Sequence, residues 1–174
     1  MDIKISGLNR LTREIETRRD SLAAKQHDLL ERLSLIGIDV ASARFQTAQY
    51  DGENDVVVSS CPEWVGENKL FLTATGNAVT FIEFGTGVHY SEQHPKAAEL
   101  GAIRGSYGQG KGSRDTWGYY GQPGTNGKVV KENDKGTLVL THGNPPARAM
   151  YDAAKEIRNR IAEIEREVFR DGGY

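Results

Sequence analysis

The stretch Phe81-Ile82-Glu83-Phe84-Gly85-Thr86-Gly87 joins an apolar run to a glycine-rich turn. Alternate residues of the run 79–84 would point to opposite faces of a β-strand, and both of these faces are apolar. A strand with two apolar faces is typical of the interior of a sheet, where both faces are covered. We therefore predict that residues 79–84 form a central strand.

Glu83 lies inside this apolar run, where an unpaired buried carboxylate would be costly. The residues that follow, Gly85-Thr86-Gly87, provide a backbone that can turn sharply and a hydroxyl that can bond to it. We expect Glu83 to pair with backbone N–H groups of this turn or with a cation such as Arg148, within one subunit or between subunits.

Other β-type runs lie on both sides of this stretch. Residues 56–58 and 70–72 are rich in β-branched and aromatic side chains, and Gly76-Asn77 is a plausible two-residue hairpin turn before residue 79. Residues 128–130 and 138–140 flank turn residues at 133–136 and predict a second hairpin. The sequence therefore predicts a small, mainly antiparallel sheet of about five strands, over residues 55–84 and 128–141.

A long helix is predicted over about residues 8–46. Its apolar residues recur at spacings of three, four and seven and form one narrow stripe: Leu8, Leu11, Ile15, Leu22, Leu29, Leu33, Ile36 and Val40. The stripe is thin near Arg18 and Arg19, so we expect this half to stay exposed or to be covered by a neighbouring chain. Gly37 costs about 1 kcal/mol relative to alanine inside a helix and marks a possible kink or end.

A second helix is predicted over about residues 145–170, with Asn144 as its cap and Pro145 and Pro146 in its first turn. Its apolar residues form a regular seam: Met150, Ala154, Ile157, Ile161, Ile164 and Val168. For a helix of this length we expect packing against its own sheet rather than in a coiled coil with a partner. The predicted fold class is α+β, with both helices on the sheet and residues 1–174 in one domain.

Residues 90–127 form a glycine-rich insertion without periodicity, which we interpret as a long loop. Its segment 105–113 approaches a phosphate-binding loop, but the residue after Lys111 is Gly112 rather than Ser or Thr, and neither a strand nor a helix is predicted around it. Aromatic residues near Lys111 and Arg114 could stack on single-stranded nucleic acid or contact a protein, and we favour a protein.

Composition limits the classes of function. The chain has 174 residues and a formal net charge of -2, so it lacks the positive field that a non-specific DNA-coating protein uses. Cys61 is the only cysteine, which excludes an intrachain disulfide, and we interpret it as buried and inert. We find neither a secretory signal nor an apolar run of the roughly 20 residues that a membrane helix needs, and expect cytosol-like surroundings.

Histidines and carboxylates offer one candidate metal cluster: His89, Glu92, His94 and His142. Their spacing matches no defined zinc site, and we interpret the histidines as hydrogen-bonded surface residues of a loop. No serine or cysteine has a recognisable base arrangement. We therefore expect no catalytic residue, no metal and no cofactor.

The order of these features along the chain resembles that of a known protein family. The stretch Phe81–Gly87, placed after a long charged helix and a β segment and before a proline-started helix, resembles the neck or tail-completion family of long-tailed phages, also called minor tail components. The specific part of the resemblance is Glu83–Gly87, although the layout covers nearly the whole chain. Family members carry a Pro-Phe-x-x-Pro-Ala-like sequence at the last helix, whereas here Pro146 is followed by Ala147-Arg148-Ala149.

The resemblance implies a structural virion protein that is assembled in the host cytoplasm into a ring, with six copies expected, at the head–tail junction. DNA would pass through the ring without specific binding, and other neck and tail proteins would be its partners, with no membrane involved. The expected interface residues are Arg18, Arg19, Tyr107, Trp117, Tyr119, Tyr120, Pro145, Pro146 and Arg148. The insertion is similar to elaborations in relatives from phages of Gram-positive bacteria.

Two alternatives stay open from the sequence. One is a metal-dependent hydrolase that uses His89, His94 and Glu83. The other is a nucleic-acid-binding protein that uses the glycine-rich and aromatic loop.

Overall fold

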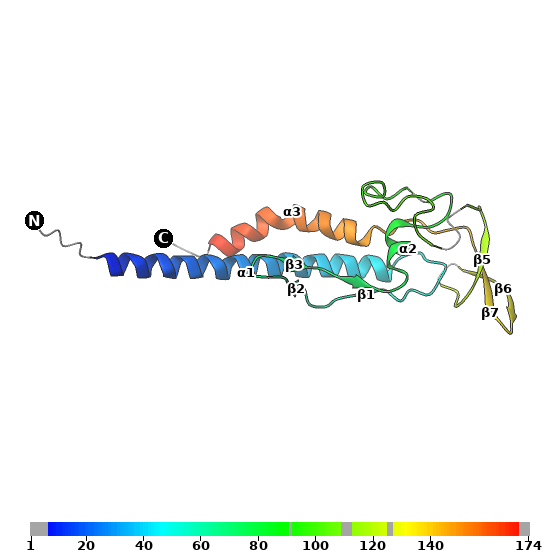
Figure 1. Ribbon diagram of the computed structural model, residues 1–174, viewed down its shortest axis with the longest axis horizontal. Coiled ribbons are helices and arrows are strands. Elements are labelled where there is room, and N and C mark those ends of the chain that lie inside the picture. The colour runs from blue at the N-terminus through cyan, green and yellow to red at the C-terminus, as the bar shows by residue number, and fades with distance from the viewer. Residues whose placement is uncertain (1–6, 91, 109–112, 125–126, 171–174) are drawn as a thin grey trace, which may run out of the picture.

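The computed structural model describes residues 7–90, 92–108, 113–124 and 127–170, and within them the molecule is elongated. Helix α1 (Leu8–Gln46) runs along the long axis, and the strands and loops gather around its C-terminal half and beyond it (Figure 1). The bounds of α1 agree with the predicted helix. No helix among the described residues combines the length and the apolar character that crossing a membrane requires.

Helix α3 (Ala149–Arg170) lies antiparallel beside the C-terminal half of α1 (Figure 1). Leu33 of α1 packs with Ile164 and Val168 of α3, and partly buried apolar residues of both helices surround this cluster. The apolar seams of the two helices thus cover each other. The prediction that the last helix packs on its own sheet is wrong, because the sheets are too small to cover a seam of this length.

Gly37 does not end α1. A Cβ atom at this position would lie 2.7 Å from Ile157 Cδ1 and 2.9 Å from Leu72 Cδ1, which is too close for an unshifted side chain. The glycine therefore allows α3 and the segment around Leu72 to approach the helix backbone.

The strands pair in antiparallel fashion, as predicted, but within the described residues they form three small sheets rather than one. Strand β1 (Val57–Val58) pairs with β4 (Ala74–Thr75), and β2 (Glu63–Trp64) pairs with β3 (Leu70–Phe71). The third sheet has the order β5-β7-β6, with β5 at Trp117–Tyr120, β6 at Lys128–Asn133 and β7 at Gly136–Thr141. The β6–β7 hairpin was predicted, whereas β5 lies in the segment that we interpreted as a loop.

Helix α2 (Val79–Phe84) replaces the predicted central strand. The carboxylate of Asp55 accepts hydrogen bonds from Asn77 N at 2.7 Å and from Ala78 N at 2.8 Å, so it binds backbone groups just before the helix begins. Gly76-Asn77 is consequently the lead-in to a helix and not a turn between strands. The prediction failed because a short, mostly apolar run of six residues fits an enclosed helix as well as a central strand.

Both sides of α2 are covered. Ile82 packs in a buried cluster with Phe45, Ala78 and Ala149, which joins α2 to the ends of α1 and α3. On another side, the rings of Phe81 and Phe84 lie near the ring of Tyr107, at centroid distances of 5.8 and 6.5 Å. The stretch Phe81–Gly87, called the motif below, is therefore the point where the helical and looped parts of the molecule meet.

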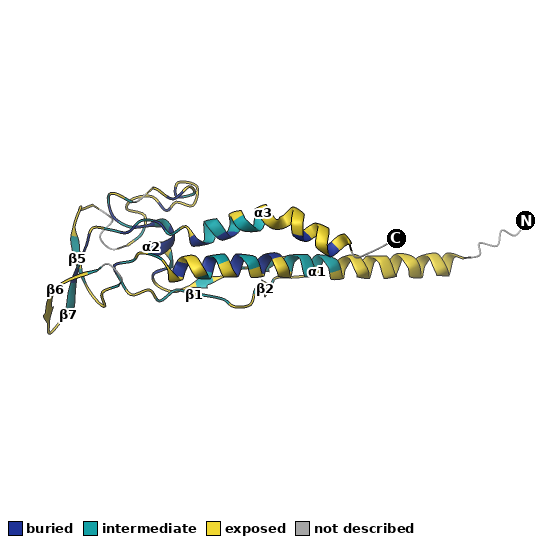
Figure 2. Ribbon diagram, turned by 180° about the vertical axis from the view of Figure 1, so that it is seen from behind, coloured by how far each residue is buried: buried dark blue, intermediate teal, exposed yellow. Residues whose placement is uncertain are grey.

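Burial is uneven along the chain. The N-terminal part of α1 is exposed on all sides, whereas its C-terminal part alternates between buried and exposed residues (Figure 2). Cys61 is exposed, which corrects the expectation that it is buried, because it lies in a turn before β2 rather than in the core.

Candidate functional site

The side chain of Glu83 caps the beginning of α3. Its Oε2 accepts a hydrogen bond from Met150 N at 2.9 Å, and its Oε1 accepts one from Tyr151 N at 3.0 Å. These are N–H groups of the first helical turn, which have no partner within the helix. An N-cap side chain normally binds them, but Arg148, which precedes the helix, has no side-chain oxygen. A carboxylate from α2 takes that role and also lies favourably at the positive end of the helix dipole.

His94 completes the surroundings of this carboxylate. Its Nε2 lies 3.2 Å from Glu83 Oε1, and its Nδ1 accepts a hydrogen bond from Lys96 N at 3.1 Å. Because Nδ1 accepts, the proton must be on Nε2, which donates to Glu83. The imidazole is only 3% exposed and contacts the rings of Phe84 and Tyr151. The interpretation of His94 as a surface residue is wrong, because its ring lies between Phe84 of α2 and Tyr151 of α3.

The expectation that Glu83 needs a partner is confirmed, but its partners are not those that we predicted. They are backbone groups of α3 and His94, not N–H groups of Gly85-Thr86-Gly87 or the Arg148 side chain. Arg148 takes part through its backbone, since its N–H donates to Glu83 O at 3.3 Å. Its side chain is exposed, and its φ of 55° places it in the left-handed region.

The turn after α2 is tied to the segment before α3. Thr86 N donates to Asn144 O at 2.9 Å, and Thr86 Oγ1 accepts from both Asn144 N and Asn144 Nδ2 at 3.0 Å. Asn144 is thus not the cap of α3, which begins five residues later than Asn144, at Ala149. Pro145 and Pro146 precede the helix instead of lying in its first turn.

The close contact between the turn at Thr86 and the segment at Asn144, called the Thr86–Asn144 crossing below, requires a glycine at position 85. Its φ is +79°, and a Cβ atom there would lie 2.8 Å from both Asn144 O and Pro146 N. Both neighbours are backbone atoms that cannot move aside cheaply. The glycine of the motif therefore serves close backbone contact as well as the turn.

A second set of buried polar groups surrounds Asp51, and Asn144 links it to the Thr86–Asn144 crossing. Asp51 N donates to Asn144 Oδ1 at 3.0 Å, and the Asp51 carboxylate accepts a hydrogen bond from the hydroxyl of Thr141. The hydroxyl of Tyr119 donates to the Asp51 carbonyl oxygen. Sequence reasoning did not single out Asp51 or Thr141, because nothing local distinguishes them from other loop and strand residues.

These groups border an open cleft of about 620 Å³. Its lining residues come from the 50–52 turn, the motif, the insertion and the third sheet: Tyr50, Asp51, Gly52, Phe81, Thr86, Gly87, Tyr107, Gly108, Ser113, Arg114, Trp117, Gly118, Tyr119, Thr141 and Asn144. Burial raises the pKa of Tyr50 and of Tyr107 above the usual value, and it raises the pKa of Tyr119 to about 12. These three tyrosines are thus partly withdrawn from water.

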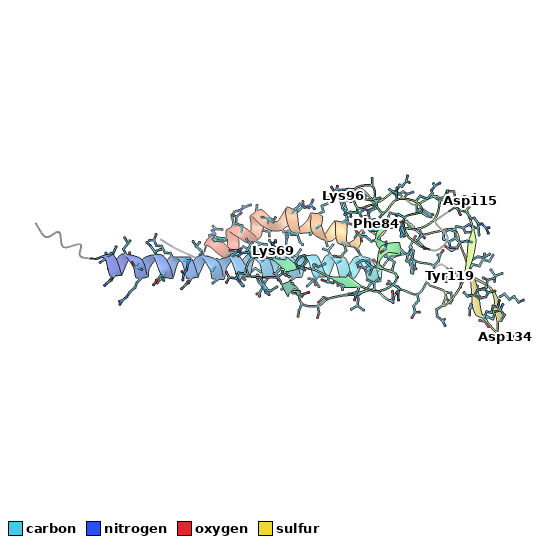
Figure 3. The ribbon with its side chains drawn as sticks, viewed as in Figure 1. Lys69, Phe84, Lys96, Asp115, Tyr119 and Asp134 are labelled. Atoms are coloured by element: carbon cyan, nitrogen blue, oxygen red, sulfur yellow. The ribbon has the colours of Figure 1, made fainter. Side chains whose placement is uncertain are left out.

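The predicted interface residues differ in exposure. Near the start of α3, Arg148 is exposed, Pro145 is partly buried and Pro146 is buried. Arg18 and Arg19 are exposed on α1, and Tyr120 is exposed on β5, where Figure 3 labels its neighbour Tyr119. Tyr107, Trp117 and Tyr119 are partly buried in the cleft, and the hydroxyl of Tyr107 donates to Gly85 O. Lys111 and the other residues 109–112 of the phosphate-loop-like segment lie outside the described part of the chain.

The proposed metal ligands are not brought together. Glu83 and His94 are adjacent but bind each other and α3, whereas His89 is exposed and lies 3.6 Å from Asp115. Glu92 is exposed, and His142 bonds to Thr116. Among the described residues, no group of three or more His, Cys, Asp or Glu side chains is placed to hold a metal ion.

Comparisons of the chain with models of known protein families, with curated proteins and with solved structures found no match.

Proposed function

We propose that this chain is a non-enzymatic structural subunit of a tailed-phage or prophage virion. In this proposal it assembles as a hexameric ring at the head–tail junction, contacts other neck and tail proteins, and lets DNA pass through the centre without specific binding. The Glu83–Gly87 resemblance motivates the proposal. The feature of the structure that supports it most is the uncovered N-terminal part of α1.

That part of α1 carries apolar residues with nothing against them in the described chain. Leu8, Leu11, Ile15 and Leu22 are 59%, 52%, 58% and 56% exposed. They continue the stripe that α3 covers further along, and α3 ends near Lys25, whose Nζ lies 5.7 Å from the centre of the Phe169 ring. The uncovered part, residues 8–25, is roughly 27 Å long.

Covering these four side chains would contribute on the order of 5 kcal/mol before the cost of association. The exposed part of the helix also lacks tertiary packing, which supplies most of the stability of helices in proteins. Both considerations favour a subunit that neighbouring chains complete, as ring assembly requires.

The motif itself supports a structural role. The oxygens of Glu83 are occupied by Met150 N, Tyr151 N and His94, and a metal or substrate would have to displace them. Every bond of the Thr86–Asn144 crossing is likewise internal. This arrangement fits a motif that joins α2, α3 and the loops of one subunit.

Electron microscopy of particles made without this chain tests the proposal. We expect filled heads and separate tails that fail to join, and normally joined particles would contradict it. Complementation with the double variant Leu11→Glu/Ile15→Glu should not restore joining. Thr17→Glu/Ala24→Glu, on the opposite side of the same exposed helix segment, adds the same charges and should restore it.

A further inference from the structure

In the described part of the chain, the cleft beside the motif holds a carboxylate, that of Asp51, which has no cationic partner. Asp51 is 7% exposed, and its carboxylate has one hydrogen-bond donor in the described chain, the Thr141 hydroxyl on Oδ2. No cationic side chain of the described residues lies within salt-bridge distance of it. A buried carboxylate without a cation is costly, so a positively charged ligand at this place would be stabilised.

The walls of the cleft suit a flat cation. Tyr50, Phe81, Tyr107, Trp117 and Tyr119 all line it together with Asp51. Aromatic faces attract cations, and a guanidinium group stacks on them better than an ammonium while it binds a carboxylate through two N–H groups. Carboxylate and aromatic walls together favour arginine over lysine.

The cleft also has room for more than one side chain. Its volume of about 620 Å³ is within the range of pockets that hold ligands of several functional groups. Trp117, Gly118 and Tyr119 belong to β5, which is at the edge of its sheet and pairs only with β7 among the described strands. A free strand edge can bind an extended polypeptide through backbone hydrogen bonds.

We propose that this cleft binds an arginine side chain that an extended segment of a partner protein presents along the edge of β5, with the guanidinium group at Asp51. The proposal does not depend on the virion role. Among the described lining residues, Arg114 is the other charged one. It is exposed, so water screens its repulsion of the ligand more strongly than the attraction of Asp51.

Two-dimensional NMR of the full chain provides the test, because the sequence contains two tryptophans. The indole N–H of Trp117 reports on the cleft. Trp64 stacks on His27 beside α1 and serves as an internal control. The probes are the peptide acetyl-Gly-Gly-Arg-Gly-Gly-amide, the same peptide with neutral citrulline in place of arginine, and methylguanidinium as the cation alone.

We expect the arginine peptide to shift the Trp117 signal in a saturable manner, without moving that of Trp64, and to bind about tenfold more tightly than the citrulline peptide. Methylguanidinium should bind more weakly than the arginine peptide. Equal binding of the two peptides, or no saturable shift, would overturn the proposal. Equal affinity of methylguanidinium and the arginine peptide would overturn its polypeptide part.

Two variants test the charges of Asp51 and Arg114 separately. Asp51→Asn should remove the preference for arginine over citrulline, and Arg114→Gln should strengthen binding of the arginine peptide. If Asp51→Asn does not fold, Phe81→Leu leaves the carboxylate and the Trp117 probe in place and should weaken arginine binding several-fold through loss of an aromatic wall. Unchanged affinity in Phe81→Leu and Arg114→Gln would contradict the assigned position of the cation.

Discussion

The Glu83 carboxylate reaches across 68 residues of sequence to accept a hydrogen bond from Tyr151 N at 3.0 Å, and with it caps the first turn of α3. A second bond from Met150 N and a third contact with His94 use the same carboxylate. This cap joins α3 to α2 and to His94 of the loop region.

Glu83→Ala should lower the free energy of unfolding by about 3 kcal/mol, because it leaves buried donors of α3 and His94 without an acceptor. Glu83→Gln should cost about 1–2 kcal/mol, since one oxygen remains but an NH₂ group faces an N–H donor. Urea unfolding followed by circular dichroism measures both. The control is Glu53→Ala, an exposed glutamate for which we expect a change within about 0.5 kcal/mol. Equal stability of Glu83→Ala and the parent would refute the capping role.

The sequence allowed prediction of the two long helices, because a stripe such as Leu29, Leu33 and Ile36 is a local pattern with many repeats. It also indicated that Glu83 needs a partner, because a carboxylate that is buried with an apolar run is costly when it is unpaired. It did not identify that partner. Two donors are backbone groups of α3, and the pattern Asn144-Pro145-Pro146 predicted the wrong start for this helix. The third partner, His94, comes from a loop without periodicity.

Short elements were predicted less well for a physical reason. A run such as 79–84 has too few residues to distinguish helical from strand spacing, and the deciding contact is the bond between Asp55 and the Ala78 N–H, 23 residues apart. Strand β5 was missed because Trp117–Tyr120 is short and lies among glycines. Its strand conformation depends on pairing with β7, which no local pattern reveals.

Gly85→Ala should destabilise the protein more than Gly101→Ala. Both glycines have positive φ, +79° and +69°, but only at Gly85 would a Cβ atom meet backbone atoms of another segment. We expect about 1 kcal/mol for the left-handed strain at Gly101 and roughly 3 kcal/mol at Gly85, where a clash adds to it. Thermal and urea unfolding of the two variants give the comparison, and equal losses would show that the Asn144 crossing tolerates a side chain.

Arg148→Gly should stabilise the protein by about 1 kcal/mol. Arg148 has a φ of 55°, where a residue with a Cβ atom is strained and glycine is not, and its side chain has no hydrogen bond or ion pair in the described chain. Arg148→Ala removes the same charge without relieving the strain and serves as the matched control. A gain of equal size in Arg148→Ala would assign the effect to the charge instead of the backbone.

Asp55 should make stability depend on acid pH. Hydrogen bonds from Asn77 N and Ala78 N lower the pKa of Asp55 below its usual value of 3.8. The stabilisation is therefore fully present above pH 3.8 and is lost as the pH falls through the lower pKa of the folded state. The free energy of unfolding of Asp55→Asn should differ most from that of the parent near neutral pH, and this difference should shrink below pH 3.8. Asp134→Asn, in the exposed β6–β7 turn, should follow the parent at every pH.

Tyr119 should produce the opposite dependence at alkaline pH. Burial raises its pKa from 10.0 to about 12, with smaller contributions from Tyr50 and Asp51. Because the folded-state pKa is the higher one, the stabilisation is complete below pH 10.0 and is lost as the pH rises towards about 12.

Ultraviolet titration of phenol ionisation, combined with urea unfolding at each pH, measures this behaviour. Tyr119→Phe should remove the ionisation near pH 12 and flatten the loss of stability in that range. At neutral pH it should cost about 1 kcal/mol, because the bond to the Asp51 carbonyl is lost. Tyr120→Phe changes the adjacent, exposed tyrosine of the same strand and should retain the step near pH 12. A parent protein whose tyrosines all ionise near pH 10.0 would show that the cleft wall at Tyr119 is hydrated.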